Sequence, residues 1–187
     1  MANADTMRGF TPIKNIDGTP FNGATIKCAL LVADATATFI GDAVTLSGTA
    51  SAEGYPSVQQ AAASDTQIFG VVTSFDAAPT DLETQYRKAS TLRLCNVVPA
   101  GSALFKIQSD GATDITDVGR QADITVGSGS TVSGLSAMEL DHSNLGTGAN
   151  LTVIGFDERP DNEIAAADVD VIVRINESWL HGTTAAI

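Results

Sequence analysis

The sequence predicts a mainly β protein: a single β-sandwich or barrel-like domain with long loops over residues 25–187, preceded by an extended N-terminal arm over residues 1–24. Three observations support this prediction. Short hydrophobic runs alternate with the period of two that is typical of half-buried strands. Turn-forming pairs such as Asp17-Gly18 and Asn22-Gly23 recur between the runs. Aromatic residues make up only 5% of the chain, so the core must be built from Val, Ile, Leu and Ala.

The predicted strands follow one another along the chain with dense turn signals between them. In residues 26–33 apolar side chains occupy both faces, which is typical of a strand covered on both sides. Phe39, Val44 and Leu46 flank a predicted turn or bulge at Gly41-Asp42, and a Gly/Ser/Pro-rich loop follows. Further strands are predicted over residues 68–75, 92–98, 103–107, 151–156 and 169–175.

Helical signals are confined to two short stretches. Residues 79–83 carry a capping-box pattern, with Thr80 at the N-cap and Glu83 at N3, which predicts one helical turn. Residues 114–121 are the other weakly helical stretch. The Gly/Ser-rich stretch 126–136 has the composition of a flexible linker, but its interleaved aliphatic residues equally favour a Gly-rich strand or a long ordered hairpin.

The charge balance argues against nucleic acid as a partner. Twenty-two acidic residues against ten basic ones give a net charge of −12, whereas phosphate contacts need clustered Lys and Arg. No basic residue lies between Lys27 and Arg87, although seven acidic residues do. We refer to residues 28–86 as the acidic interval. If the basic groups on either side of it fold together, the molecule has a basic underside and an acidic outside.

Few side chains are arranged for catalysis. Asp141-His142-Ser143 contains the three residue types of a catalytic triad, but a triad converges in space and adjacent side chains point apart. We therefore interpret His142 as a polar loop residue. The GSGS run at 127–130 lacks the Lys-Ser/Thr pair of a phosphate-binding loop. We predict that the protein is not an enzyme and uses no cofactor.

Metal, redox and membrane signals are equally sparse. Asp110, Asp114 and Asp117 lack the alternating oxygen ligands and closing Glu of a calcium loop, so we interpret them as turn-forming residues and predict no metal site. Cys28 and Cys95 are expected to be buried thiols, and the sequence does not decide whether they form a disulfide with each other. No run is long enough to span a membrane, and residues 1–10 lack the apolar core of a signal peptide, so synthesis in a cytoplasm and no membrane partner are expected.

Several segments together resemble one protein family. They are NADTMRGF, TFIGDAV, GYPSVQQA, GVVTSF, TQYRKAST, GSGSTVSGLSAMELD, RPDNEI and VIVRINESWL. They resemble the cement (decoration) proteins of tailed-phage capsids, and the resemblance covers nearly the whole chain. It implies a non-enzymatic, β-rich cement domain that is usually trimeric and sits outside the capsid lattice at three-fold or quasi-three-fold axes.

This resemblance implies the expected partners, whereas the contact residues are our own hypothesis from the arm and the basic residues, since the family has no motif to carry over. The partners would be the major capsid protein and two further copies of the chain, on the outer capsid surface of a virion made in a bacterial cytoplasm. The residues expected to contact the capsid come from the arm and from a second basic group: Arg8, Phe10, Lys14, Arg87, Lys88 and Arg93. The residues expected at a trimer interface lie along and after the last strand: Val173, Ile175 and Trp179. Trp179 is equally compatible with a core-capping role.

Three alternatives remain at this point. A tail-tube or head–tail joining subunit shares the β architecture but would form rings of higher order. A carbohydrate-binding adhesion module would need exposed aromatic side chains, and the chain has one Trp and two Tyr. An unrecognised hydrolase is the last alternative.

Overall fold

The computed structural model describes residues 3–176 and 178, which form eleven β-strands and two short 3-10 helices. The prediction of a mainly β fold is confirmed. The strands are β1 Thr11–Asn15, β2 Ile26–Leu30, β3 Ala43–Ala50, β4 Pro56–Gln60, β5 Gly70–Phe75, β6 Arg93–Pro99, β7 Ala103–Gln108, β8 Gln121–Thr125, β9 Glu139–Asp141, β10 Leu151–Phe156 and β11 Asp170–Ile175. The helices are η1 Ile115–Asp117 and η2 His142–Asn144. No helix among these residues is long and apolar enough to cross a membrane.

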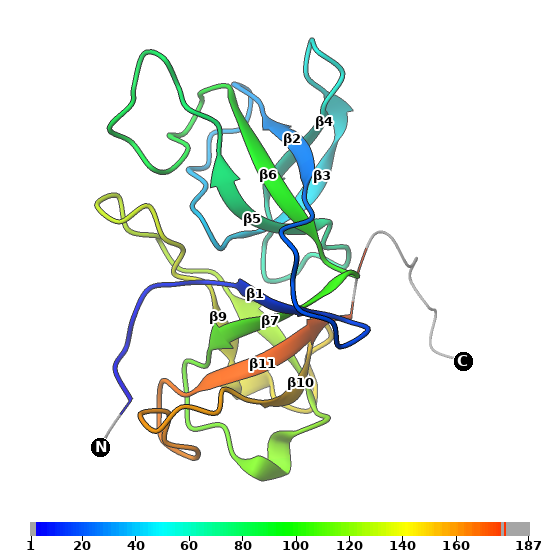
Figure 1. The fold of residues 1–187 in the computed structure, drawn as a ribbon, viewed down its shortest axis with the longest axis vertical. Helices are drawn as coiled ribbons and strands as arrows, with labels where there is room; N and C mark the ends of the chain where they lie inside the picture. The colour runs from blue at the N-terminus through cyan, green and yellow to red at the C-terminus, as the bar shows by residue number, and fades with distance from the viewer. Residues whose placement is uncertain (1–2, 177, 179–187) are drawn as a thin grey trace.

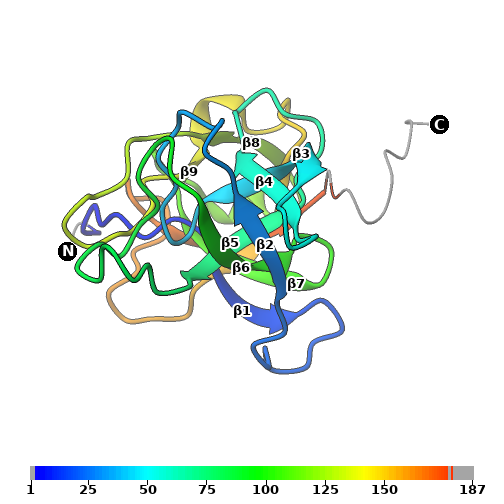
Figure 2. The ribbon, with the colours of Figure 1, turned by 90° about the horizontal axis from the view of Figure 1, so that it is seen from above.

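The strands form a closed barrel and a six-stranded sheet. The barrel has the order β2-β4-β3-β5-β6, and the sheet has the order β1-β7-β11-β10-β8-β9. Figure 1 shows the barrel above the sheet, and the view from above in Figure 2 places the barrel strands in front of it. Strand pairs are antiparallel except β2 and β4, which meet in parallel at Ala29 and Ser57.

One core joins the barrel to the sheet. Its larger cluster combines barrel residues such as Ile68 and Val71 with sheet residues such as Phe105 and Ile107, all at most 1% exposed. A smaller cluster fills the inside of the barrel: Cys28, Leu30, Val44, Val58, Phe69, Val72, Cys95 and Val97. Because the larger cluster crosses the junction, the two sheets share one core.

The predicted N-terminal arm is integrated into the sheet. Residues 11–15 form β1, which pairs with β7 at the sheet edge and has a bulge between Pro12 and Lys14. An edge position suits Pro12, since it has no N–H to donate. The turn predicted at Asp17-Gly18 is present, with Gly18 at φ +86°. Asn22-Gly23 forms no hairpin, because it connects β1 to β2, which belong to different sheets.

The short helical predictions have different outcomes. Residues 79–83 form turns rather than a helix, and the Asp81 amide donates to the Ala78 carbonyl. Residues 114–121 do contain the 3-10 helix η1, whose first turn is closed by the Asp114 amide donating to Asp117 Oδ2 at 2.8 Å. Stretch 126–136 belongs to a long hairpin loop between the antiparallel strands β8 and β9, as one of the alternatives predicted.

The last strand does not supply a subunit surface at the predicted positions. β11 lies inside the sheet between β7 and β10. Val173 is 0% exposed and Ile175 is 1% exposed, because both pack into the chain's own core. The prediction that these two side chains line a trimer interface is therefore corrected. Trp179 lies outside the described residues.

Candidate functional site

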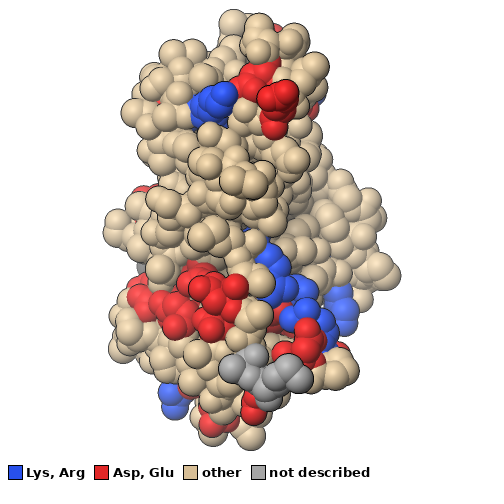
Figure 3. Space-filling view, turned by 90° about the vertical axis from the view of Figure 1, so that its left-hand side faces the viewer, with Lys and Arg blue, Asp and Glu red and all other residues tan. Residues whose placement is uncertain are grey.

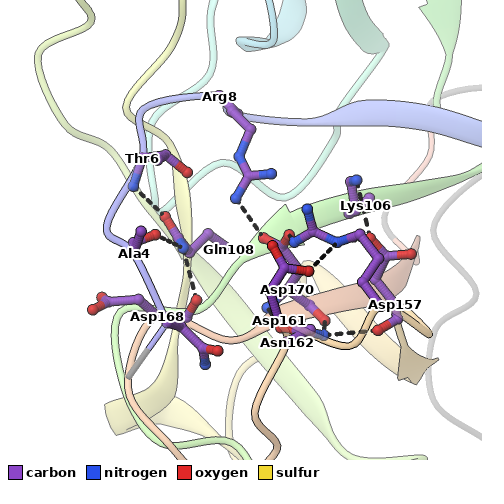
Figure 4. A network of polar contacts seen from close by, with 12 residues as sticks. Ala4, Thr6, Arg8, Lys106, Gln108, Asp157, Asp161, Asn162, Asp168 and Asp170 are labelled. Carbon is purple, nitrogen blue, oxygen red and sulfur yellow. Dashed lines mark hydrogen bonds and ion pairs between the residues drawn. The ribbon is translucent and has the colours of Figure 1, made fainter. Parts of the chain in front are cut away.

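The N-terminal segment before β1 is held against the sheet by hydrogen bonds to a buried amide. The Thr6 backbone N–H donates to Gln108 Oε1 at 2.9 Å. Gln108 Nε2 donates to the carbonyls of Ala4 and Asp168, at 2.9 and 2.7 Å. Figure 4 shows this arrangement at the end of β7. Gln108 is 4% exposed, so its side chain anchors the segment with both of its polar atoms satisfied.

A chain of alternating charges continues from this anchor (Figure 4). Asp170 is 2% exposed and pairs with Arg8 on one oxygen, at 3.1 Å, and with Arg159 on the other. Asp157 then joins Arg159 to Lys106, at 2.9 and 3.1 Å. A cavity of about 410 Å³ lies beside these residues. Because Asp170 pairs with both Arg8 and Arg159, the network fastens the N-terminal segment to the sheet.

Phe10 fixes the same segment to the barrel and lies inside the protein. It is 2% exposed, its ring meets Phe105 edge to face at 6.0 Å, and its amide donates to the Gly41 carbonyl at 2.9 Å. Gly9 precedes it with φ +60°, and a Cβ there would lie 2.4 Å from the Ser136 Cβ. The prediction that Phe10 contacts a capsid is therefore corrected, because its ring is part of the core. Lys14 lies on β1 and is exposed.

Arg87, predicted as a surface contact, is the largest fully buried side chain among the described residues. Its guanidinium donates to the Asp34 carboxylate at 3.0 Å and to the Thr91 carbonyl at 2.9 Å. It also donates to the carbonyls of Leu31, Asp34 and Thr36. The two terminal guanidinium nitrogens therefore join loop 84–92 to loop 31–38, while Nε braces loop 84–92 itself at Thr91. The prediction of a capsid contact at Arg87 is corrected, since no part of the side chain reaches the surface.

The other two members of the predicted basic group are also engaged within the chain. Lys88 pairs with Asp81, and this pair raises the pKa of the ammonium and lowers that of the carboxyl. Arg93 donates to three backbone carbonyls and lies over the Phe75 ring at 5.2 Å. Lys88 keeps 51% of its side-chain surface exposed, so it can still meet a partner.

The predicted separation into a basic underside and an acidic outside is not observed. Carboxylates of the acidic interval pair with the basic residues that border it, as in Lys27 with Asp76 at 2.7 Å and Arg87 with Asp34 at 3.0 Å. Figure 3 shows acidic and basic side chains gathered next to each other on one face. The sequence shows where the acidic and basic residues lie along the chain, but it does not show that their side chains come together in the fold.

Asp42 is a buried carboxyl that the sequence did not single out. It is 0% exposed and accepts hydrogen bonds from the Phe39 amide at 2.8 Å and from Gln60 Nε2 at 2.9 Å. Among the described residues no Lys or Arg forms an ion pair with it. Burial raises its pKa to about 6. The group closes the turn at Gly41, where the barrel meets the N-terminal segment.

In the run Asp141-His142-Ser143, Asp141 caps the 3-10 helix η2 at its N-terminus. Asp141 Oδ1 accepts hydrogen bonds from the amide and the hydroxyl of Ser143, at 2.9 and 2.6 Å. The His142 amide donates to Asp110 Oδ1 at 2.8 Å. These contacts build the turn at η2, and they leave the Ser143 hydroxyl donating to a carboxylate rather than to a histidine base. Within the described part of the chain, no group of three or more His, Cys, Asp or Glu is arranged to hold a metal ion.

The most prominent surface consists of three loops that lie on one side of the molecule. We call it the loop face and define it as loops 31–38, 76–92 and 126–138. Isolated bridges tie Thr38 to Arg87 and Ile40 to Leu135, and Phe39 stacks on Tyr86 at 4.9 Å between ring centroids. Figure 1 shows loops 76–92 and 126–138 projecting from the same side, to the left.

The charged residues of the loop face lie on two of its three loops, with Asp34 on loop 31–38 and Asp76, Asp81, Glu83, Arg87 and Lys88 on loop 76–92. Loop 126–138 contains no charged residue, and Val132 within it is 91% exposed. Figure 3 views this side and shows a largely uncharged band between the charged side chains above and below it. Three further exposed aliphatic residues lie on the other two loops: Val32 at 59%, Leu82 at 75% and Leu92 at 52%. An apolar cavity of about 420 Å³ lies between the N-terminal segment and this face, lined in part by Phe10, Ile40 and Leu135.

Comparison with protein-family models, with curated proteins and with solved structures gave no match to this chain. The functional argument therefore depends on the residues and surfaces described above.

Proposed function

We propose that this chain is a structural virion protein that binds the outer surface of a tailed-phage capsid as a trimer and stabilises the lattice. The observation that carries the proposal is the loop face, whose exposed aliphatic side chains Val32, Leu82, Leu92 and Val132 project from one side of the β scaffold. The family resemblance of the sequence supplies the identity of the partner. Because Arg87 and Lys88 are paired within the chain, we place the proposed contact on the exposed aliphatic side chains of the loop face.

The physical basis of such a contact is the burial of exposed aliphatic side chains. Val132 and Leu82 are 91% and 75% exposed in the isolated chain. Fully burying a side chain of this kind contributes about 1.5–3 kcal/mol. A protein that binds the assembled lattice better than its separate subunits stabilises the lattice by mass action. Joining three copies in one trimer increases the avidity further, because each later contact forms at a high effective concentration.

Binding to capsids tests this function directly. Purified protein is mixed with decoration-free capsids of the phage that encodes it, and the bound fraction is measured by co-sedimentation. We expect saturable binding, and we expect Val132→Asp to weaken it at least ~10-fold, because a carboxylate would have to be buried in the contact. Ile115→Asp is the matched control. Ile115 is 65% exposed at η1, away from the loop face, so this variant should bind as the wild type does (Figure 1).

Two results would contradict the proposal. Wild-type protein that fails to sediment with capsids would reject the cement function. Equal weakening by both substitutions would reject the loop face as the contact. The mass of the protein in solution separates the related possibilities, since three copies of 19.2 kDa give a trimer of about 58 kDa, whereas a tail or joining subunit would form a larger ring.

A further inference from the structure

The barrel contains two cysteines that face each other across neighbouring strands. Cys28 on β2 is the direct register partner of Cys95 on β6, and these strands are antiparallel. Both thiols are free and 0% exposed. Both side chains belong to the cluster that fills the barrel interior, together with residues such as Leu30 and Val97. The two thiols therefore project from the same face of the strand pair into the same space.

This placement satisfies the backbone requirement for a disulfide. Directly opposed residues of an antiparallel pair have Cα atoms about 4.5–5.5 Å apart. A disulfide spans Cα separations of about 4.4–6.8 Å. The chain between the two cysteines passes through β3, β4 and β5, so a bond between them would enclose three of the five barrel strands within one covalent loop.

We propose that Cys28 and Cys95 are a redox modification site that forms a cross-strand disulfide inside the barrel. The oxidant is a small disulfide such as oxidised glutathione. One cysteine thiolate attacks a sulfur of the oxidant and releases one glutathione thiolate. The other cysteine thiolate then attacks the protein sulfur of the mixed disulfide and releases the second glutathione. The two protons lost by the cysteines go to the two glutathiones, and the two electrons reduce the oxidant.

Burial determines when this reaction occurs. Since the thiolate is the nucleophile, the raised pKa of both thiols slows attack in the folded protein. Desolvation is the main cause at both positions, and it raises the pKa of Cys28 to about 11. The oxidant must also enter a closed barrel. The disulfide therefore forms while the barrel is open, during folding or local unfolding, and the same burial then protects it from reductants.

Refolding in a defined redox buffer tests the proposal. Reduced, unfolded full-length protein is refolded with an excess of oxidised over reduced glutathione, and its thiols are then counted in denaturant. We expect both thiols to be lost, the mass to fall by two hydrogen atoms, and a proteolytic digest to contain a peptide linking Cys28 to Cys95. The melting temperature should rise by roughly 5–15 °C over that of the reduced protein, because the bond restricts a long loop of the unfolded chain.

Native oxidation and single substitutions sharpen the test. The folded, reduced protein should lose its thiols several-fold more slowly than the refolding protein does. Cys28→Ser and Cys95→Ser should each leave one thiol or one mixed disulfide with glutathione, and neither should show the rise in melting temperature on oxidation. Two thiols that remain free after oxidative refolding of the wild type would overturn the proposal, as would disulfides formed only between chains. These outcomes do not depend on the proposed capsid function, so the two proposals can fail separately.

Discussion

Replacing Arg87 should destabilise the protein more than replacing any of the other basic residues predicted to contact the capsid. Arg87→Met removes the guanidinium and keeps much of the side-chain volume. It removes the guanidinium donors of the Asp34 carboxylate and of the Thr36 and Thr91 carbonyls, whereas the carbonyls of Leu31 and Asp34 each keep a backbone donor. Removing one partner of a buried ion pair costs about 3–5 kcal/mol, because the other group stays in a poorly solvated position. We expect the free energy of unfolding to fall by that amount.

The neighbouring lysine provides the matched control. Lys88 carries the same charge one position later, but its side chain is 51% exposed and pairs with a partly exposed Asp81. Because solvent screens an exposed pair of this kind, Lys88→Met should change stability little. Arg87→Lys should resemble Arg87→Met, since an ammonium cannot reproduce the planar fork that reaches carbonyls on both loops.

Urea unfolding and amide exchange together measure this effect. The midpoint and slope give the free energy of unfolding for each variant. In Arg87→Met, amide exchange should accelerate at the hydrogen bonds that Arg87 organises, such as the Ser90 amide bonded to the Asp34 carbonyl at 2.9 Å. A loss below about 1 kcal/mol for Arg87→Met, or an equal loss for Lys88→Met, would refute the assignment of Arg87 as an internal cross-link.

Three further predictions concern the junction between the barrel and the N-terminal segment. The pKa of Asp42 is raised from 3.8 to about 6, so between these pH values the folded state binds more protons than the unfolded state and stability falls as pH rises. Asp42→Asn should remove this slope, and its stability relative to the wild type should increase by about 2 kcal/mol from pH 4 to pH 7 in urea titrations; a constant difference would contradict the burial of a carboxylate. Phe10→Ala should cost about 3–5 kcal/mol by thermal or urea unfolding, because it empties a ring position in the shared core, and a loss below about 1 kcal/mol would place the ring at the surface. Gly9→Ala should destabilise more than Gly18→Ala, since both residues have positive φ but only the first would place its Cβ against Ser136 and Gly41; equal thermal shifts would contradict that packing.

The strands of this fold were predictable where apolar and polar residues alternate along the chain. Residues 103–107 and 169–175 alternate clearly, and they form β7 and β11 with their apolar side chains buried. The capping-box pattern at 79–83 was misleading because a single helical turn is unstable without further packing. In the structure, the Arg87 backbone that follows this pattern pairs with Thr38 instead of extending a helix.

The candidate site was less predictable because it depends on contacts between distant segments. Arg87 and Lys88 are adjacent and look alike in sequence, yet one is fully buried and the other half exposed. Asp170 alternates with Val169 and Val171 in the sequence, which is typical of a solvent-facing position, but in the structure it is 2% exposed and pairs with Arg8 of the N-terminal segment. Val132 lies among small residues that suggested a linker, and only the hairpin that displays it reveals an exposed apolar loop.

Hydrogen exchange on the capsid-bound protein tests the central claim most directly. The exchange of backbone amides is compared between free protein and protein bound to decoration-free capsids. We predict slower exchange in loops 76–92 and 126–138 on binding, with residues 111–120 around η1 unchanged. Slower exchange confined to residues 111–120, or no bound protein at all, would contradict the assignment of the loop face as the capsid-binding surface.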